Sequence, residues 1–570
     1  MRRLRTSRRL GTTGAIAFAV ALIASLPGNA AVNPKDADEP LCAQRPALCT
    51  ELDNPWTYDD YTYVSGHDEP SVLFYSGLPG SGNSNHYTLT LPSDPAAPPK
   101  QDGTGTTWNF QLRPTFWLGM IMCDDQSAPN PGAVCRPDSD FNIYTSTDPK
   151  SPRYLGLTPG QAYMEMQFYP PGWGPISCTD ANGNQDGKWC AALTIDSDPE
   201  NMNTGQENNE ACQDLVGPEP VNYAVITKDG IPVAPPRPDT PFSEQAVVTP
   251  DTLEFNNGDR LTVDMNDTPA GFQVVIHDLT TGQSGSMTAS AENGFGHALF
   301  QPDASTCTMV NYTFHPMFST SNQFTRNIWA AHTYNVAASD EIGHFEYCNA
   351  VDEFGGNCTS PAGADTSLDD DDTECFPYPV NGPLGDILET LTGCVQADDD
   401  FDGPSYQGSA WPGGPGAVAG NVPTPIRFTS PLFSLPLFGS RFRLNYSQVA
   451  FEADLPRIEG TDFSTTNDCQ RHVSNPADPN PGSGCVNPPL GPNGPAFYPL
   501  YTTTNADGSC EWQQGGANIP GTTNDFGGSS TTEYGSLLLS DYPAPGFTIT
   551  QRYNNFQQVL RRNPCPASGK

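Results

Sequence analysis

The residues whose types and spacing best suit chemistry lie in one short segment, which reads Tyr-Met-Glu-Met-Gln-Phe-Tyr from residue 163 to residue 169. Successive side chains of a β-strand point to opposite faces, so Tyr163, Glu165, Gln167 and Tyr169 share one face, while the apolar residues between them face a core. Aromatic rings stack on sugar rings, and amide and carboxylate groups bond to sugar hydroxyls. The pattern therefore predicts a glycan-binding cleft on one face of a sheet.

A carboxylate at the centre of such a face can also do catalytic work. Glu165 is the candidate general acid/base or nucleophile, and Glu346 or another carboxylate is the candidate partner, because most glycosidases use a pair. Trp117 and Trp173 join Tyr163 and Tyr169 as candidates for sugar stacking. The alternative is an ordinary strand whose polar side chains face solvent, since one face of an antiparallel sheet is often exposed to solvent.

Histidines form a second group, because five of the eight lie between positions 277 and 344. We expect residues 329–348 to form a hairpin that turns near residues 338–339 and brings His332 beside His344. With His315 as a further ligand, such a group can bind copper, iron or zinc. The alternative is that these are hydrogen-bonded structural histidines, since no spacing typical of a zinc protease is present.

An acidic loop predicts a calcium site. Asp398, Asp400 and Asp402 alternate and are followed by Gly403, which matches the first half of an EF-hand loop. Ser409 stands where an EF-hand carries glutamate, so the motif is incomplete. A solvated acidic turn is the alternative interpretation.

The elements that must position these residues are mostly strands. Short runs of β-branched and aromatic residues alternate with turn signals, and the chain holds 54 Gly and 58 Pro. This is typical of a mainly β protein of the jelly-roll or β-sandwich type. A proline-rich stretch at 231–241 predicts a linker. The expected organisation is a first β-domain with an N-terminal arm at 31–235, a histidine-rich β unit at 245–350, an acidic cysteine-containing region at 351–405, and a Gly/Pro-rich region with short strands at 406–570.

The N-terminus predicts export. Residues 1–30 combine five arginines, a twelve-residue apolar run and a small-residue cleavage site after Ala30, which is typical of a signal peptide. No later stretch is long and apolar enough to span a membrane, so we expect no membrane insertion. All 16 cysteines follow the cleavage site, and an oxidising compartment favours disulfides over zinc. The close-spaced candidate pairs are Cys42–Cys49, Cys123–Cys135, Cys178–Cys190, Cys348–Cys358 and Cys469–Cys485, and spacing alone does not fix which of them form.

The net charge of the chain limits the kinds of molecule that it is expected to bind. The chain carries a formal charge of −39, and loss of the five signal-peptide arginines takes it to −44. Such a surface repels nucleic acid and acidic polymers, so neutral polysaccharide is the expected partner. The sequence therefore predicts a secreted glycan hydrolase or lyase. A secreted copper, iron or zinc oxidase or monooxygenase is one alternative, and a non-catalytic carbohydrate-binding or adhesin-like surface protein is another.

Overall fold

The structure of the protein is a computed structural model. The residues it describes are 69–76, 78, 80–93, 108–127, 161–171, 178, 187–197, 200–201, 206–217, 220–317, 334–345, 348–351, 358–361, 380–382, 385–387, 400–401, 426–437, 440–455, 457–458, 500–504, 510–514, 538–544, 547–560 and 563–565.

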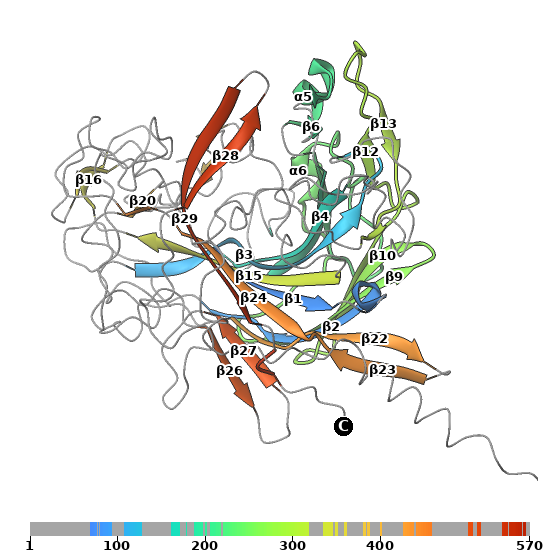
Figure 1. The fold of residues 1–570 in the computed structure, drawn as a ribbon, viewed down its shortest axis with the longest axis vertical. Helices are drawn as coiled ribbons and strands as arrows, with labels where there is room; N and C mark the ends of the chain where they lie inside the picture. Colours follow the sequence, from blue (N-terminus) through green and yellow to red (C-terminus); the bar gives the residue numbers. More distant parts are fainter. Residues whose placement is uncertain are drawn as a thin grey trace, which may run out of the picture. The chain divides into compact units, whose positions relative to one another are not determined.

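Antiparallel β-sheet dominates the described residues, which confirms the predicted mainly β class. A larger sheet has β14 paired at one end of β3, and Figure 1 shows its central strands side by side. Its strands run in the order β28 (Leu538–Ala544), β29 (Phe547–Leu560), β24 (Gln448–Leu455), β1 (Glu69–Ser76), β15 (Tyr334–Phe345), β3 (Trp108–Cys123), β4 (Gln161–Tyr169), β5 (Cys190–Ser197) and β8 (Val221–Val225), with β14 at His315–Pro316.

A smaller sheet completes the framework. Its strands run in the order β11 (Ser284–Ala289), β10 (Gly271–Asp278), β9 (Arg260–Thr268), β2 (Ser84–Thr90), β21 (Ile426–Thr429), β27 (Cys510–Gln514) and β26 (Leu500–Thr504), and β22 (Leu432–Leu437) pairs with both β2 and β23 (Ser440–Asn445).

The other described elements are short. They are the 3-10 turn η2 (Ser81–Asn83), the helices α5 (Glu210–Val216) and α6 (Phe242–Gln245), and the paired strands β6 (Glu200–Asn201) with β7 (Gln206–Glu207), β12 (Gly296–Ala298) with β13 (Met309–Asn311), β16 (Cys348–Val351) with β17 (Cys358–Pro361), β18 (Val380–Gly382) with β19 (Gly385–Ile387), and β20 (Asp400–Phe401) with β25 (Arg457–Ile458). None of the described helices has the length and apolar character needed to cross a membrane.

The core follows from period-two alternation in the strands. In β9 every second residue from Leu261 to Met265 is buried, and in β4 Met164, Met166 and Phe168 are fully buried. These side chains belong to one hydrophobic cluster that draws on both sheets. At its centre Phe74 of β1 meets Trp512 of β27 edge to face, with ring centroids 5.6 Å apart. Each sheet thus buries one face against the other.

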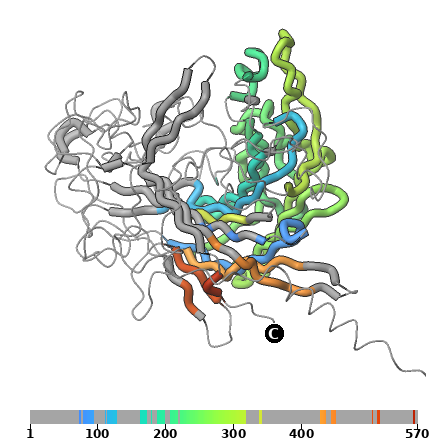
Figure 2. The backbone as a smooth tube through the Cα atoms, viewed as in Figure 1, coloured from blue at the N-terminus to red at the C-terminus, as the bar shows by residue number. Residues whose placement is uncertain are grey.

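One sheet contains strands from both sides of the domain boundary that the sequence predicts between residues 235 and 245. Strand β2, from the first predicted domain, pairs along its length with β9 of the second. The structure describes residues 220–317 without a gap, and Figure 2 shows this part of the backbone as a coloured tube. The two segments therefore share their sheets, and the prediction of separate β units is wrong.

The proline-rich stretch at 231–241 is also not a free linker. Its carbonyls accept hydrogen bonds from the folded part of the chain, because the Gln245 amide donates to Pro235, Pro236 and Arg237. The Tyr223 amide of β8 donates to Pro236 as well. Prolines lack a donor but keep their acceptor, so the segment packs along the edge of β8 as an irregular strap.

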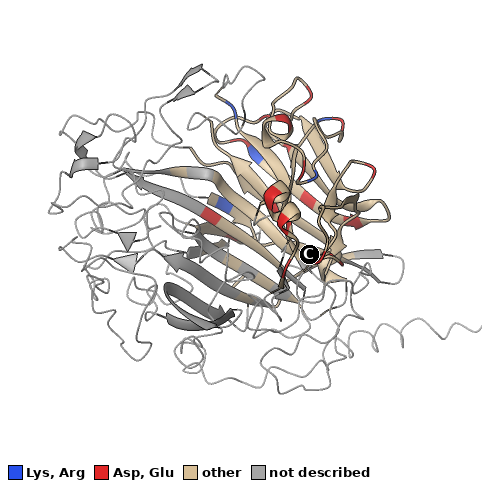
Figure 3. Cartoon of the chain, turned by 90° about the horizontal axis from the view of Figure 1, so that it is seen from above, with Lys and Arg blue, Asp and Glu red and all other residues tan. Residues whose placement is uncertain are grey.

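Disulfides reinforce this framework, as expected for an oxidising compartment. The predicted pair Cys178–Cys190 is confirmed, and Cys212–Cys307 and Cys510–Cys565 are two further bonds. No cysteine in the described part of the chain is free. In Figure 3 the positions of Asp and Glu, in red, are spread over the described part of the cartoon, in keeping with the charge of −39.

Candidate functional site

The predicted polar strand lies on the outer face of the larger sheet, the face turned away from the shared core. On this face the Gln167 amide donates to the Glu165 carboxylate at 2.6 Å, and the Tyr169 hydroxyl donates to the Gln167 carbonyl oxygen. The three side chains form one hydrogen-bonded row, since residues two apart on a strand project the same way. The row fixes the orientation of the Gln167 amide and holds the carboxylate in place. Glu165 and Gln167 remain partly exposed.

Apolar groups flank this row at both ends. Towards one end, Tyr163 packs against the buried cluster of Ile121, Cys123 and Met317. Towards the other, Tyr169 belongs to a cluster with the Cys178–Cys190 disulfide, β8 and Ala246. Polar side chains held between two apolar clusters sit in a less polar environment than free solvent, which strengthens their electrostatic interactions.

The position opposite Glu165 on the neighbouring strand β3 is Gly119. A Cβ atom at Gly119 would lie 2.6 Å from Cζ3 of Trp117 and 2.9 Å from the Tyr163 hydroxyl oxygen. The Trp117 ring and the Tyr163 hydroxyl therefore occupy the space above Gly119. The rings of Trp117 and Tyr163 are perpendicular, with centroids 5.7 Å apart. An aromatic wall thus stands directly beside the carboxylate.

A second carboxylate shares this face. In the pairing of β4 with β5, Glu165 lies opposite Thr194, and Tyr163 lies opposite Asp196. Asp196 is therefore the diagonal neighbour of Glu165 on this face. The Cα atoms of such neighbours are about 7–8 Å apart, and their Cβ atoms are somewhat closer. Both acids are partly exposed. Thr194 anchors the strands between them, because its hydroxyl donates to the Glu165 main-chain carbonyl at 3.1 Å.

The structure changes the expected roles of two aromatic residues. Trp117 is 1% exposed and Tyr169 is 5% exposed. Their ring faces are covered by neighbouring side chains, so they pack and support the site and do not offer a free surface for a sugar ring. Tyr163 and Gln167 keep partial exposure and remain available for contact with a ligand.

Several predicted site residues lie outside the described residues. These are Glu346, Trp173, Asp398, Asp402 and His332. Asp400 is described only in its backbone, within the short strand β20, so the calcium prediction stays a prediction.

The predicted histidine site is wrong in two respects. Residues 334–345 form a single strand, β15, so the hairpin that would bring His332 beside His344 is not formed. His315 pairs with Cys123 and His344 with Asn109, which are fourteen positions apart on β3. At about 3.3 Å per residue this separation is on the order of 45 Å, so His315 and His344 cannot share a metal ion. His315 instead bonds through Nδ1 to Asp267 at 2.7 Å.

Sequence reasoning missed two sets of residues. Asp196 could have been found from the alternation of β5, but its neighbour on the face depends on strand register, which the sequence does not contain. The second set is Asp124, Asp125 and His297, three residues brought together by the fold. The adjacent acids Asp124 and Asp125 were the available signal, but nothing in the sequence connects them to His297, 172 positions after Asp125.

Comparisons with known proteins add little. No protein-family model and no curated protein sequence matches the chain. Among solved structures, one that aligns is the crystal structure of Scytalido-glutamic peptidase with a peptide-based transition-state analog. It is 10% identical, the match covers 66% of this chain and 83% of that one, and the TM-score is 0.18. A TM-score of this size establishes neither a common fold nor a common function.

Proposed function

We propose that this chain is an exported hydrolase of neutral polysaccharide that uses a pair of carboxylates on the outer face of the larger sheet. The observation that carries the proposal is the diagonal placement of Glu165 and Asp196, two partly exposed acids on adjacent strands. Most glycosidases use two carboxyl groups that flank the scissile bond, with roughly 5 to 9.5 Å between the two carboxyl groups. Asp196 takes the place that the sequence suggested for Glu346.

The roles follow from the surroundings of each acid. Glu165 is held by the Gln167 amide, which donates to its carboxylate at 2.6 Å. A fixed carboxylate suits the base or nucleophile, while Asp196 serves as the proton donor to the leaving oxygen. Gln167 is a positioning residue, and Tyr163 contributes an aromatic surface beside Glu165.

Export is part of the proposal. The signal-peptide features of residues 1–30 and the disulfides both fit a protein that functions in an oxidising compartment. The large negative charge fits a neutral substrate better than an acidic one, because a polyanion would be repelled.

The first test is a substrate screen with the secreted chain. We expect new reducing ends from at least one neutral plant, fungal or bacterial polysaccharide, and no cleavage of peptide substrates. Unsaturated products would identify a lyase and contradict hydrolysis. Binding to glycans without turnover by the wild-type protein would favour the non-catalytic carbohydrate-binding alternative, and cleavage of peptides alone would overturn the glycan assignment.

A further inference from the structure

A buried histidine lies between two adjacent aspartates at one end of the larger sheet. Asp124 and Asp125 follow β3 directly, and His297 belongs to β12. The His297 side chain is 3% exposed, and its Nδ1 lies 2.7 Å from Oδ1 of Asp124. Tyr312 stacks on the imidazole, with ring centroids 4.2 Å apart and planes 24° from parallel. The ring is thus fixed in both position and tilt.

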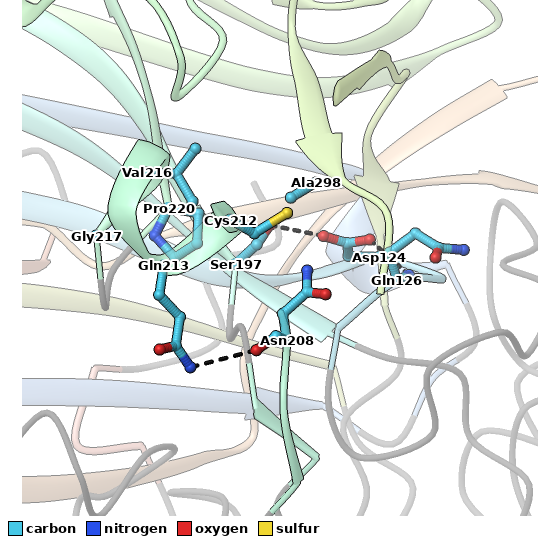
Figure 4. A pocket seen from close by; sticks show the side chains of 10 residues that line it. All are labelled: Asp124, Gln126, Ser197, Asn208, Cys212, Gln213, Val216, Gly217, Pro220 and Ala298. Atoms are coloured by element: carbon cyan, nitrogen blue, oxygen red, sulfur yellow. Dashed lines mark hydrogen bonds between the residues drawn. The ribbon is translucent and has the colours of Figure 1, made fainter. Parts of the chain in front are cut away.

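Asp124 is occupied by protein donors. Its Oδ2 accepts from the Ser197 hydroxyl at 2.6 Å, and its Oδ1 accepts from the Gln126 main-chain amide at 2.8 Å as well as from His297. Figure 4 shows the Ser197–Asp124 bond in the wall of a small pocket beside α5. A carboxylate engaged in this way orients the imidazole: it accepts a hydrogen bond from Nδ1–H, and in this tautomer Nε2 carries the lone pair.

The lone pair of Nε2 faces the second aspartate. Nε2 lies 3.9 Å from Oδ1 of Asp125, too far for a hydrogen bond. No other hydrogen bond to Nε2 is formed by the described residues. Two ligands of one tetrahedral zinc ion, each about 2.0–2.1 Å from the metal, are roughly 3.4 Å apart. Asp125 keeps 30% of its side chain exposed, so a small rotation of its carboxylate closes the difference.

Two other histidines provide an internal comparison. His86 bonds to Asp264 and His315 bonds to Asp267, each through Nδ1 at 2.7 Å. Both rings are more exposed, with 21% and 17% of the side chain accessible. Within the described part of the chain, only His297 has a carboxylate within 4.0 Å of each ring nitrogen. His297 thus differs from His86 and His315 in its deeper burial and in the second carboxylate near its ring.

We propose that Nε2 of His297 and the carboxylate of Asp125 bind a divalent transition-metal ion of the zinc class, with Asp124 as the positioning residue and water completing the coordination. An imidazole whose other nitrogen donates to a carboxylate is the usual arrangement at protein zinc sites. A mixed nitrogen and oxygen donor set suits zinc better than calcium or magnesium, which prefer oxygen alone. The site is separate from the Glu165 face and does not depend on the glycan assignment.

The test uses the full secreted chain after dialysis against EDTA, titrated with zinc chloride by calorimetry and with cobalt chloride by visible absorption. We expect one zinc ion per chain and a cobalt spectrum of low coordination number. Asp125→Asn and His297→Gln should each weaken zinc binding at least tenfold. His86→Gln and His315→Gln remove matched histidines and should bind zinc as the wild type does.

Two results would overturn the site. One is a wild-type protein that binds neither zinc nor cobalt, and the other is Asp125→Asn with wild-type affinity. The Asp125 variant decides the matter even where His297→Gln fails to fold, because Asp125 is the more exposed partner and makes fewer contacts.

Discussion

At the scale of single residues, the surroundings of Asp125 disfavour the ionised form of its carboxylate. Burial raises its pKa above the usual 3.8; the charge of His297 opposes this rise, and the charge of Asp124 adds to it. Because the pKa of Asp125 is higher in the folded state than in the unfolded state, protonated Asp125 contributes to stability below pH 3.8. This contribution is lost as the pH rises through the pKa of the folded state. Ionised Asp125 therefore destabilises the metal-free protein at neutral pH.

Asp125→Asn should consequently raise the melting temperature of the EDTA-treated protein at pH 7, and the gain should vanish as the pH approaches 3.8. With zinc present the order should reverse, because a ligand at a hundredfold excess over its Kd adds about 2.7 kcal/mol to the protein that binds it. Melting curves at both pH values, with and without zinc, check this. A variant less stable than the wild type in EDTA at pH 7 would contradict the account of Asp125.

Gln167 tests the hydrogen-bonded row in another way. Gln167→Met keeps the length of the side chain but removes both the donor to Glu165 and the acceptor for Tyr169. We expect kcat on a glycan substrate to fall about tenfold or more with little change in KM, since the carboxylate loses its orientation and not its chemistry. A rise in KM with an unchanged kcat would instead make Gln167 a substrate-binding residue.

At the scale of elements, the sequence predicted strands well and their partners poorly. The alternation of Met164, Met166 and Phe168 correctly placed the core face of β4. Residues 108–123 form one long strand, β3, whose pairing with β15 shifts register near Asp340. Pairing depends on contacts between segments far apart in the chain, which is why Asp196 was not found and why the histidine hairpin was wrong.

The contact between β3 and β4 should be sensitive to one methyl group. A Cβ at Gly119 would meet Trp117 at 2.6 Å, so Gly119→Ala should destabilise the fold by about 1–3 kcal/mol, the usual cost of overpacking. Denaturant unfolding measures this. In a Trp117→Leu background the same substitution should cost much less, because the ring that it meets is gone. An equal cost in both backgrounds would show that Trp117 does not fill this space.

At the scale of the whole molecule, the two sheets should unfold together. Strand β2 pairs with β9, and the shared core includes Phe74, Phe428 and Trp512 from both sheets. Calorimetry should therefore show one main transition for this framework, with coincident loss of near-ultraviolet circular dichroism and burial of tryptophan. Two separate transitions, or stable fragments after cleavage within residues 231–241, would restore the separate units that composition suggested.

Composition did predict the broad character of the molecule. Secretion features, the even number of cysteines and the density of turn residues led to a disulfide-bonded β protein, because these properties are summed along the chain and need no knowledge of contacts. The site needs that knowledge. Glu165, Gln167 and Tyr169 could be placed on one face from their spacing alone, but the second carboxylate and the buried His297 come from strands that only the fold brings near.

The central claim is that Glu165 and Asp196 act as one catalytic pair, and the most direct measurement is turnover of a glycan substrate at saturation by Glu165→Gln, Asp196→Asn and the double variant. Each single variant should lose about 10²–10⁴-fold in kcat while binding the substrate normally, since the carboxylates supply acid–base chemistry. The double variant should be little worse than the singles, because groups that act as a unit are not additive. Wild-type kcat in Glu165→Gln, with the substrate still cleaved, would contradict the account.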